Sequence, residues 1–173
     1  MSKAVMISIK PQWCELIAKK QKTIEVRKTR PKIKLPFKCY IYMIKSNLTG
    51  DRKAYKDRMA GKVIGEFICD DISTNYVRYD PQKDEYGYWT LLDDSCLTKN
   101  QLMEYGKCHI LYGWHISDLV IYDKPKEISE FRKATKKCFY DDLGCAIPNC
   151  DDCTECNITK PPRSWCYVEV ENV

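Results

Sequence analysis

The sequence has no long apolar run, no internal repeat and no low-complexity segment. A membrane-spanning helix needs roughly 18 or more consecutive apolar residues, and no stretch of this chain approaches that length. The opening MSKAVMISIK passes at once from a short apolar run to charge and proline, which is not the pattern of a secretory signal peptide. We therefore expect a soluble cytoplasmic protein without a membrane partner, in which 173 residues form a single domain.

Acidic residues are almost missing from one part of the chain. The segment from Lys19 to Lys38 contains nine Lys or Arg residues and one acid, Glu25. The segment from Asp141 to Glu155 shows the opposite bias, with five acids and no Lys or Arg. The net charge of +5 permits a nucleic-acid partner without requiring one. The segregation of charge along the chain is the stronger indication of a binding surface.

Histidine is scarce, with two residues, whereas cysteine is abundant, with eleven. The odd number of cysteines and the missing signal peptide disfavour a secreted disulfide framework. Scattered cysteines in such a protein are most often small buried apolar residues. Five others crowd into a short segment: Cys138, Cys145, Cys150, Cys153 and Cys156.

These five cysteines predict a structural metal site. Structural zinc is held tetrahedrally by four thiolate or imidazole ligands, so four of the five would suffice. The alternatives are unbound or redox-active cysteines and an iron–sulfur cluster, although Lys160 stands where a ferredoxin run would need its next cysteine. A catalytic zinc is disfavoured because the deaminase-type His-x-Glu motif is absent. The expected cofactor is structural zinc, in a Cys-rich insertion at 138–157 before a closing strand at 164–170.

The apolar pattern predicts five to seven short strands and two or three short helices. Strands are expected at 4–9, 23–27, 38–44, 63–72 and 164–170, with one more, broken at Gly113 or divided in two, within 108–123. Helices are expected after Pro11 and at 98–106. No β-α-β alternation is present, which favours an α+β fold built on a small mixed-to-antiparallel barrel with flanking short helices.

The TIEVR strand alternates cleanly between apolar and polar residues. Ile24 and Val26 point one way, so we expect them to face a core. Thr23, Glu25 and Arg27 point the other way and are expected to line an accessible surface. A solvated strand face with balanced charges is the plain alternative.

Two blocks of this sequence resemble the ASCH family, a branch of the PUA-like barrels. The first is SIKPQW followed by a short helix and KKQKTIEVRK; the second is the closing ITKPPRSWCYVEV, from Ile158 to Val170. The resemblance implies a PUA-like barrel and a cleft beside the first helix where RNA, DNA or a nucleobase-like ligand binds. Some members are amidohydrolases of acetylated cytidine that use a lysine, a threonine and a glutamate. Lys22 occupies the lysine's place here, whereas the threonine's place holds Glu25.

The predicted binding site combines cations, aromatic rings and one carboxylate. Cations can hold phosphates, a tryptophan can stack on a base, and a carboxylate can accept a hydrogen bond from an exocyclic amine. Trp13 also lies on an apolar helix face and could instead belong to the core. The candidate residues are Lys10, Trp13, Lys22, Thr23, Glu25, Arg27, Lys28, Ser164 and Trp165.

Three functions follow from these residues. The preferred one is a module that binds nucleic acid, most simply RNA, or a nucleobase-bearing ligand. The second is a nuclease or a hydrolase of a modified nucleoside, in which Lys22 and Glu25 would be catalytic. The third is a protein-interaction adaptor that uses the acidic segment from Asp141 to Glu155.

Overall fold

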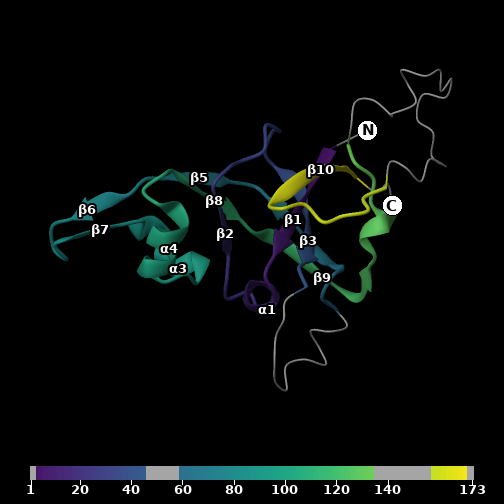
Figure 1. The fold of residues 1–173 in the computed structure, drawn as a ribbon, viewed down its shortest axis with the longest axis horizontal. Coiled ribbons are helices and arrows are strands. Elements are labelled where there is room, and N and C mark those ends of the chain that lie inside the picture. Colours follow the sequence, from purple (N-terminus) through teal and green to yellow (C-terminus); the bar gives the residue numbers. More distant parts are fainter. Residues whose placement is uncertain (1–2, 46–58, 135–156, 171–173) are drawn as a thin grey trace. The chain divides into compact units, whose positions relative to one another are not determined.

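The computed structural model describes residues 3–45, 59–134 and 157–170 (Figure 1). The chain divides into two compact units. The described part of unit 1 consists of residues 3–11, 38–45, 59–66, 121–134 and 157–170. Unit 2 consists of residues 12–37 and 67–120. No helix among these residues is long and apolar enough to cross a membrane.

Unit 1 carries most of a five-stranded mixed sheet with the order β10-β1-β3-β4-β9. Strand β1 runs parallel to β3 and antiparallel to β10. The boundaries between the two units fall within β3, β4 and β9 and after Pro11. A single turn of 3₁₀ helix, η2, covers Ile128–Glu130. The strands are β1 (Lys3–Ile9), β3 (Phe37–Met43), β4 (Val63–Cys69), β9 (Ser117–Lys126) and β10 (Trp165–Glu169).

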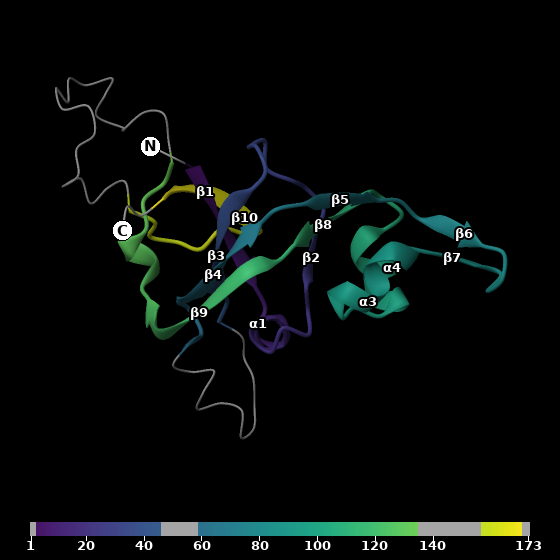
Figure 2. The ribbon, with the colours of Figure 1, turned by 180° about the vertical axis from the view of Figure 1, so that it is seen from behind.

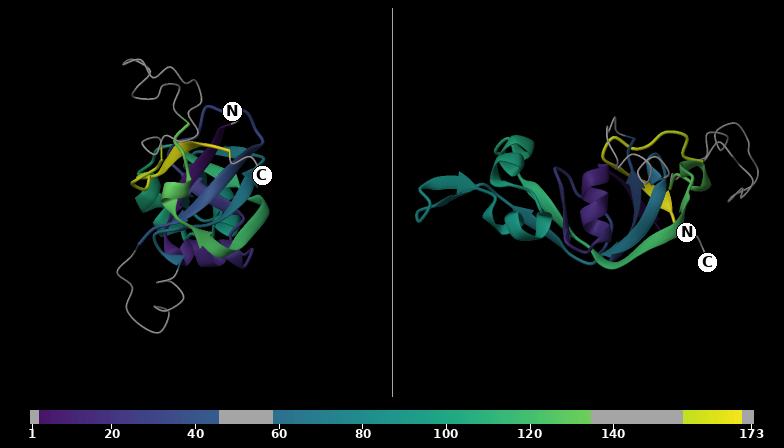
Figure 3. Two further views of the ribbon diagram at one scale, coloured as in Figure 1. Left: turned by 90° about the vertical axis from the view of Figure 1, so that its right-hand side faces the viewer. Right: turned by 90° about the horizontal axis from the view of Figure 1, so that it is seen from below.

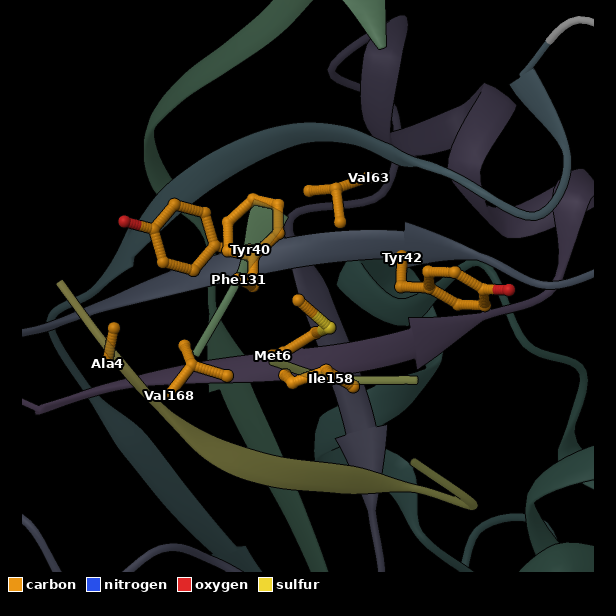
Figure 4. Close-up of a cluster of buried hydrophobic side chains, with 8 residues drawn as sticks. All are labelled: Ala4, Met6, Tyr40, Tyr42, Val63, Phe131, Ile158 and Val168. Carbon is orange, nitrogen blue, oxygen red and sulfur yellow. The ribbon is translucent and has the colours of Figure 1, made fainter. Parts of the chain in front are cut away.

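Alternate residues of these strands build the core of unit 1. Ala4 and Met6 point to one face of β1, as residues two apart in a strand must. The ring of Tyr40 meets that of Phe131 edge-on, with centroids 4.8 Å apart. Figure 4 shows the cluster, which consists of Ala4, Met6, Tyr40, Tyr42, Val63, Phe131, Ile158 and Val168.

Unit 2 contains a three-stranded antiparallel sheet with the order β2-β8-β5 and a separate two-stranded hairpin. The hairpin β6–β7 extends beyond α3 and α4 (Figure 2; Figure 3, right). The strands are β2 (Ile24–Arg27), β5 (Ile72–Asn75), β6 (Arg78–Asp80), β7 (Glu85–Gly87) and β8 (Leu111–His115). The helices are α1 (Pro11–Ala18), whose first residue belongs to unit 1, η1 (Trp89–Leu91), α3 (Leu92–Ser95) and α4 (Lys99–Gly106).

The core of unit 2 lies against one face of its three-stranded sheet. Val26 and Leu111 pack there with Tyr88, Leu91 and Leu102. Helix α4 begins with a reciprocal cap in which the Thr98 side chain accepts a hydrogen bond from the Gln101 N–H and the Gln101 side chain accepts one from the Thr98 N–H.

The α+β class predicted from the sequence is confirmed, with mixed sheets and short helices. The described strands form a five-stranded, a three-stranded and a two-stranded sheet, and an isolated antiparallel bridge joins Val168 of β10 to Lys133. A closed barrel is not shown among these described strands and stays a prediction. The predicted strand at 63–72 is two strands separated at Asp70 and Asp71, and the chain between 108 and 123 divides at Ile116 rather than at Gly113. The predicted Cys-rich insertion lies almost wholly outside the described residues, so it and the single domain stay predictions.

Candidate ligand-binding site

Strand β2 places the charged residues of the TIEVR motif. In the antiparallel register with β8, Glu25 lies opposite Trp114 and Arg27 lies opposite Tyr112, so these four side chains share one face. Val26 lies opposite Gly113 on the other face and packs in the core of unit 2. The facing predicted from the alternation is therefore confirmed.

The expected accessibility of that face is wrong for its charged residues. Glu25 is 6% exposed, Arg27 is 8% exposed and Lys22, just before the strand, is 2% exposed. Part of the cover comes from the same unit, because the ring of Phe37 packs edge-on against Trp114, the cross-strand neighbour of Glu25, with centroids 5.9 Å apart. Both faces of β2 are thus covered.

Lys22, Glu25 and Arg27 form a buried charge cluster. The Lys22 ammonium donates hydrogen bonds to the carbonyl oxygens of Ile24 (2.7 Å) and Ser95 (2.6 Å) and lies 3.5 Å from a Glu25 carboxylate oxygen. The other Glu25 oxygen lies 2.9 Å from a terminal nitrogen of Arg27. Two of the three N–H donors of the ammonium therefore bond to carbonyl oxygens, and Glu25 supplies the nearby counter-charge.

The electrostatics of the buried charge cluster are asymmetric, with two cations for one carboxylate. Burial lowers the pKa of Lys22, and the charge of Glu25 acts in the opposite direction. The Lys22 ammonium also lies 5.6 Å from the ring centroid of Trp13, which is half-buried. Trp13 therefore packs against this cluster. This position is compatible with both of its predicted roles, as a ring that stacks on a base and as part of the core.

Beside the buried charge cluster lies a more exposed rim. The Lys28 ammonium sits 4.9 Å from the ring centroid of Tyr105 on α4, and the Arg30 guanidinium sits 5.8 Å from that of Tyr112 on β8. Lys28 and Arg30 are exposed, Tyr105 is 37% exposed and Tyr112 is half-buried. We call these four residues the cation–aromatic rim.

The rim and the buried charge cluster are electrostatically connected through Tyr105. Partial burial raises the pKa of its hydroxyl; the nearby Arg27 acts against that rise and Glu25 adds to it. Tyr105 thus lies within the field of both charges while its ring remains accessible from outside.

The other predicted site residues are Thr23, Lys10, Ser164 and Trp165. Thr23 is half-buried and its N–H donates to the carbonyl of Asp94 at 3.0 Å. Lys10, Ser164 and Trp165 belong to unit 1, so the structure describes them separately from the cluster of unit 2. Lys10 is exposed. The remaining two are tied into unit 1: the Ser164 carbonyl accepts the Ser8 N–H at 2.9 Å and Trp165 packs on Tyr167.

The proposed metal ligands cannot be placed. Cys138, Cys145, Cys150, Cys153 and Cys156 all lie outside the described residues. Within residues 3–45, 59–134 and 157–170, no three His, Cys, Asp or Glu side chains come together in a way that could hold a metal ion. Zinc therefore stays a prediction.

No protein-family model and no curated protein matches the chain. The solved structures similar to it include ASCH from Zymomonas mobilis, with a TM-score of 0.57, 15% identity, and 96% of this chain and 87% of that chain covered. The chain has the ASCH fold. A tyrosine-to-phenylalanine mutant of ZmASCH gives a TM-score of 0.58 at 15% identity, covering 97% of this chain and 91% of that one. Its serine-to-alanine mutant gives 0.58 at 14% identity, covering 96% and 88%. At these identities, the ASCH likeness concerns the fold alone.

Sequence reasoning missed four members of the site. Ser95 joins the buried charge cluster through its carbonyl oxygen. Because this contact does not involve the side chain, the residue type could not predict it. Tyr105 and Tyr112 come from elements far along the chain, and only the register of β8 and the position of α4 bring them to the end of β2. Arg30 could have been found, because it continues the run of basic residues after Arg27.

Proposed function

We propose that this protein is a nucleic-acid-binding or nucleotide-binding module whose contact surface is the cation–aromatic rim. The observation that carries the proposal is the pairing of two exposed cations with two aromatic rings at the end of β2, Lys28 with Tyr105 and Arg30 with Tyr112. Arg and Lys bind phosphate, Arg in bidentate fashion, and tyrosine rings stack on bases of any sequence. A nucleotide offers both groups within one residue.

The buried charge cluster has a supporting role in this proposal. The Glu25 carboxylate is occupied by Lys22 and Arg27 and is too deeply buried to read a base edge directly. It fixes Arg27, and therefore the adjacent Lys28, at the end of a short strand. We infer that this rigidity holds the rim in place, since a cation that is already ordered loses less entropy on binding.

The alternative of a nuclease or nucleoside hydrolase that uses Lys22 and Glu25 receives less support from this geometry. A general base must reach the proton that it abstracts within hydrogen-bond distance. Lys22 is 2% exposed and bonded to two carbonyl oxygens, and Glu25 is 6% exposed and paired with Lys22 and Arg27. The adaptor alternative rests on the acidic segment 141–155, which lies outside the described residues.

For the Cys-rich segment we propose a structural zinc ion held by four of the five clustered cysteines. The support is the spacing Cys150-x2-Cys153-x2-Cys156 together with Cys138 and Cys145 upstream. Thiolates are the ligands that closed structural zinc sites use. Zinc would stabilise that segment rather than take part in ligand binding.

Fluorescence anisotropy with labelled single-stranded RNA and DNA tests the proposed function. Tyr105→Ala should weaken binding roughly 5- to 150-fold, the equivalent of the 1–3 kcal/mol that a stacked base loses on alanine substitution. Tyr105→Phe should retain most of the affinity because the ring remains. The matched control is Tyr86→Ala, which removes a tyrosine of the β6–β7 hairpin that is 59% exposed. Equal losses from the two alanine variants, or no binding to either nucleic acid, would refute the proposal.

A further inference from the structure

The β6–β7 hairpin of unit 2 has one open edge, along β6. Among the described strands, β6 pairs with β7 alone. Strand β7 lies next to α4 (Figure 2), and its Glu85 forms an ion pair with Lys99 at the start of that helix. An open edge carries backbone N–H and C=O groups to which a further strand can bond, and a hairpin of two strands gains stability from such an addition.

Strand β6 presents charges on one face and an aromatic ring on the other. Arg78 and Asp80 are two residues apart and share a face, whereas Tyr79 between them points to the opposite face. Tyr79 lies opposite Tyr86 of β7, with ring centroids 5.1 Å apart. Because Tyr79 is 47% and Tyr86 is 59% exposed, this pair of rings forms an apolar surface on the hairpin.

The charges of β6 are only partly satisfied within the hairpin. One oxygen of the Asp80 carboxylate accepts a hydrogen bond from the N–H of Gln82 at 2.9 Å, and the other lies 3.6 Å from the Lys83 ammonium. Arg78 is exposed, and its guanidinium has no ion-pair partner within the part of the chain that the structure describes. The strand therefore offers a cation and an acid on either side of Tyr79.

We propose that two copies of this chain associate by antiparallel pairing of their β6 strands. In a pair related by a two-fold axis at Tyr79, residue 78 of each copy faces residue 80 of the other. Arg78 of each copy then faces Asp80 of the second copy, so the sequence Arg78-Tyr79-Asp80 is complementary to itself. On the opposite face, the tyrosines of the two hairpins form one row of four rings across a four-stranded sheet.

Other axes give poorer pairing. An axis at Arg78 would place two cations opposite each other, and an axis at Asp80 would place two acids opposite each other. On β7, an axis at Tyr86 would set Glu85 opposite Gly87, without charge complementarity. The strand has 3 residues, so the contact is small and we expect a weak dimer that depends on concentration. This inference is independent of the ligand proposed for the cation–aromatic rim.

Sedimentation velocity of the full chain, without nucleic acid, measures the association. Reductant is included because Cys108 is exposed and could cross-link two copies. Between about 1 μM and about 1 mM protein, the wild type should pass from monomer to dimer. Arg78→Asp and Asp80→Arg should each weaken the dimer at least about tenfold, because like charges then face each other at both ends of the pairing.

Charge exchange between the two variants tests the register. An equimolar mixture of the Arg78→Asp and Asp80→Arg proteins should form a heterodimer, since each 78–80 pair again joins opposite charges. The chain that carries both substitutions should dimerise with itself for the same reason. The control is Lys107→Asp, which reverses an exposed charge of unit 2 outside the hairpin and should leave the association unchanged.

Hydrogen–deuterium exchange of the wild type adds a readout that needs no substitution. The amides of residues 78–80 should exchange more slowly as the protein concentration rises through the dimerisation range. A chain that stays monomeric throughout that range overturns the proposal. It is also overturned by a dimer that Arg78→Asp leaves intact, by variants whose mixture stays monomeric, or by β6 amides that dimerisation does not protect.

Discussion

At the scale of single residues, the buried charge cluster matters for both the proposed function and the stability of the protein. The Glu25 carboxylate offsets two buried cations, Lys22 and Arg27. Taking charges out of water costs several kcal/mol per ion, and removing one partner leaves the others uncompensated. The buried charges are tolerated only while their mutual contacts are kept. The stability of the end of β2 therefore depends on Glu25.

Glu25→Ala is therefore expected to lower the free energy of unfolding by about 3–5 kcal/mol, because two cations stay buried without a counter-charge. Urea unfolding followed by circular dichroism measures the change. The control is Glu15→Ala, which breaks an exposed pair with Lys19 at 2.9 Å and should cost less than about 1 kcal/mol. Glu25→Gln, which keeps the volume but removes the charge, should resemble Glu25→Ala. Similar unfolding midpoints for the Glu25→Ala and Glu15→Ala variants would contradict this account.

Glu66 offers a prediction about pH in unit 1. Its carboxylate accepts hydrogen bonds from Lys38 at 2.8 Å and Tyr122 at 2.5 Å, on the strands to either side. Burial alone would raise the pKa of Glu66, but these hydrogen bonds outweigh it and the pKa is lowered. A lowered folded-state pKa contributes stability above the unfolded value of about 4.3, and this contribution is lost as the pH falls through the folded value.

Glu66→Gln should accordingly cost about 1–2 kcal/mol at pH 7, the order of a charged hydrogen bond in a partly exposed site. The difference from the wild type should shrink as the pH falls below about 4.3, where the wild-type carboxylate also becomes protonated. Urea unfolding at pH 7 and pH 3 gives both values. A difference that stays the same at the two pH values would show that charge is not the cause.

At the scale of elements, the end of helix α4 shows how a glycine can be required for space. Gly106 is the last residue of the helix, and a Cβ there would lie 2.2 Å from the hydroxyl of the buried Tyr88. The next residue, Lys107, takes the left-handed conformation that ends the helix, with φ of 49°. The sequence suggests that Gly106 stops the helix, but its role is to let Tyr88 approach.

Substitutions at these two neighbouring positions should change the free energy of unfolding in opposite directions. Gly106→Ala is expected to destabilise the protein by about 1–3 kcal/mol through overpacking against Tyr88. Lys107→Gly relieves about 1–2 kcal/mol of left-handed strain against about 0.5–1 kcal/mol of added backbone entropy, so the protein should be slightly more stable. Thermal unfolding compares them. A stabilised Gly106→Ala variant would show that the contact with Tyr88 is not limiting.

The β2 element also shows what the sequence can and cannot predict. The alternation in TIEVR correctly predicted that Val26 faces a core and that Glu25 and Arg27 share the other face, because the side-chain period of a strand is a local property. It could not predict that the other face is covered, because the covering residues come from elsewhere in the chain. Phe37 lies ten residues after Arg27, and Ser95, which accepts from Lys22, lies some seventy residues away.

At the scale of the whole molecule, the two ends of the chain were informative about the fold and the middle was not. The SIKPQW and KTIEVR blocks pointed to ASCH, and the fold bears this out although the solved structures share only 14–15% of their residues with this chain. Of the elements between 78 and 106, the sequence predicted the helix at 98–106 but neither the hairpin nor α3. Tyr105 lies on that predicted helix but outside the two motif blocks, so the rim was not predictable from the blocks.

The charge and cysteine patterns divide the molecule further, into a basic region at 19–38 and a Cys-rich acidic region at 138–156. If the second is a zinc-held segment, elemental analysis of the purified full chain should return about one zinc per chain. Changing both Cys150 and Cys153 to serine should abolish zinc binding, because a closed site cannot lose two of its thiolates and remain tetrahedral. Cys108→Ser is the control, since Cys108 is exposed and unpaired in the described part of the chain. A fully folded protein without zinc would contradict the assignment. Loss of nucleic-acid binding in the zinc-free variant would show instead that the Cys-rich segment contributes to the ligand surface.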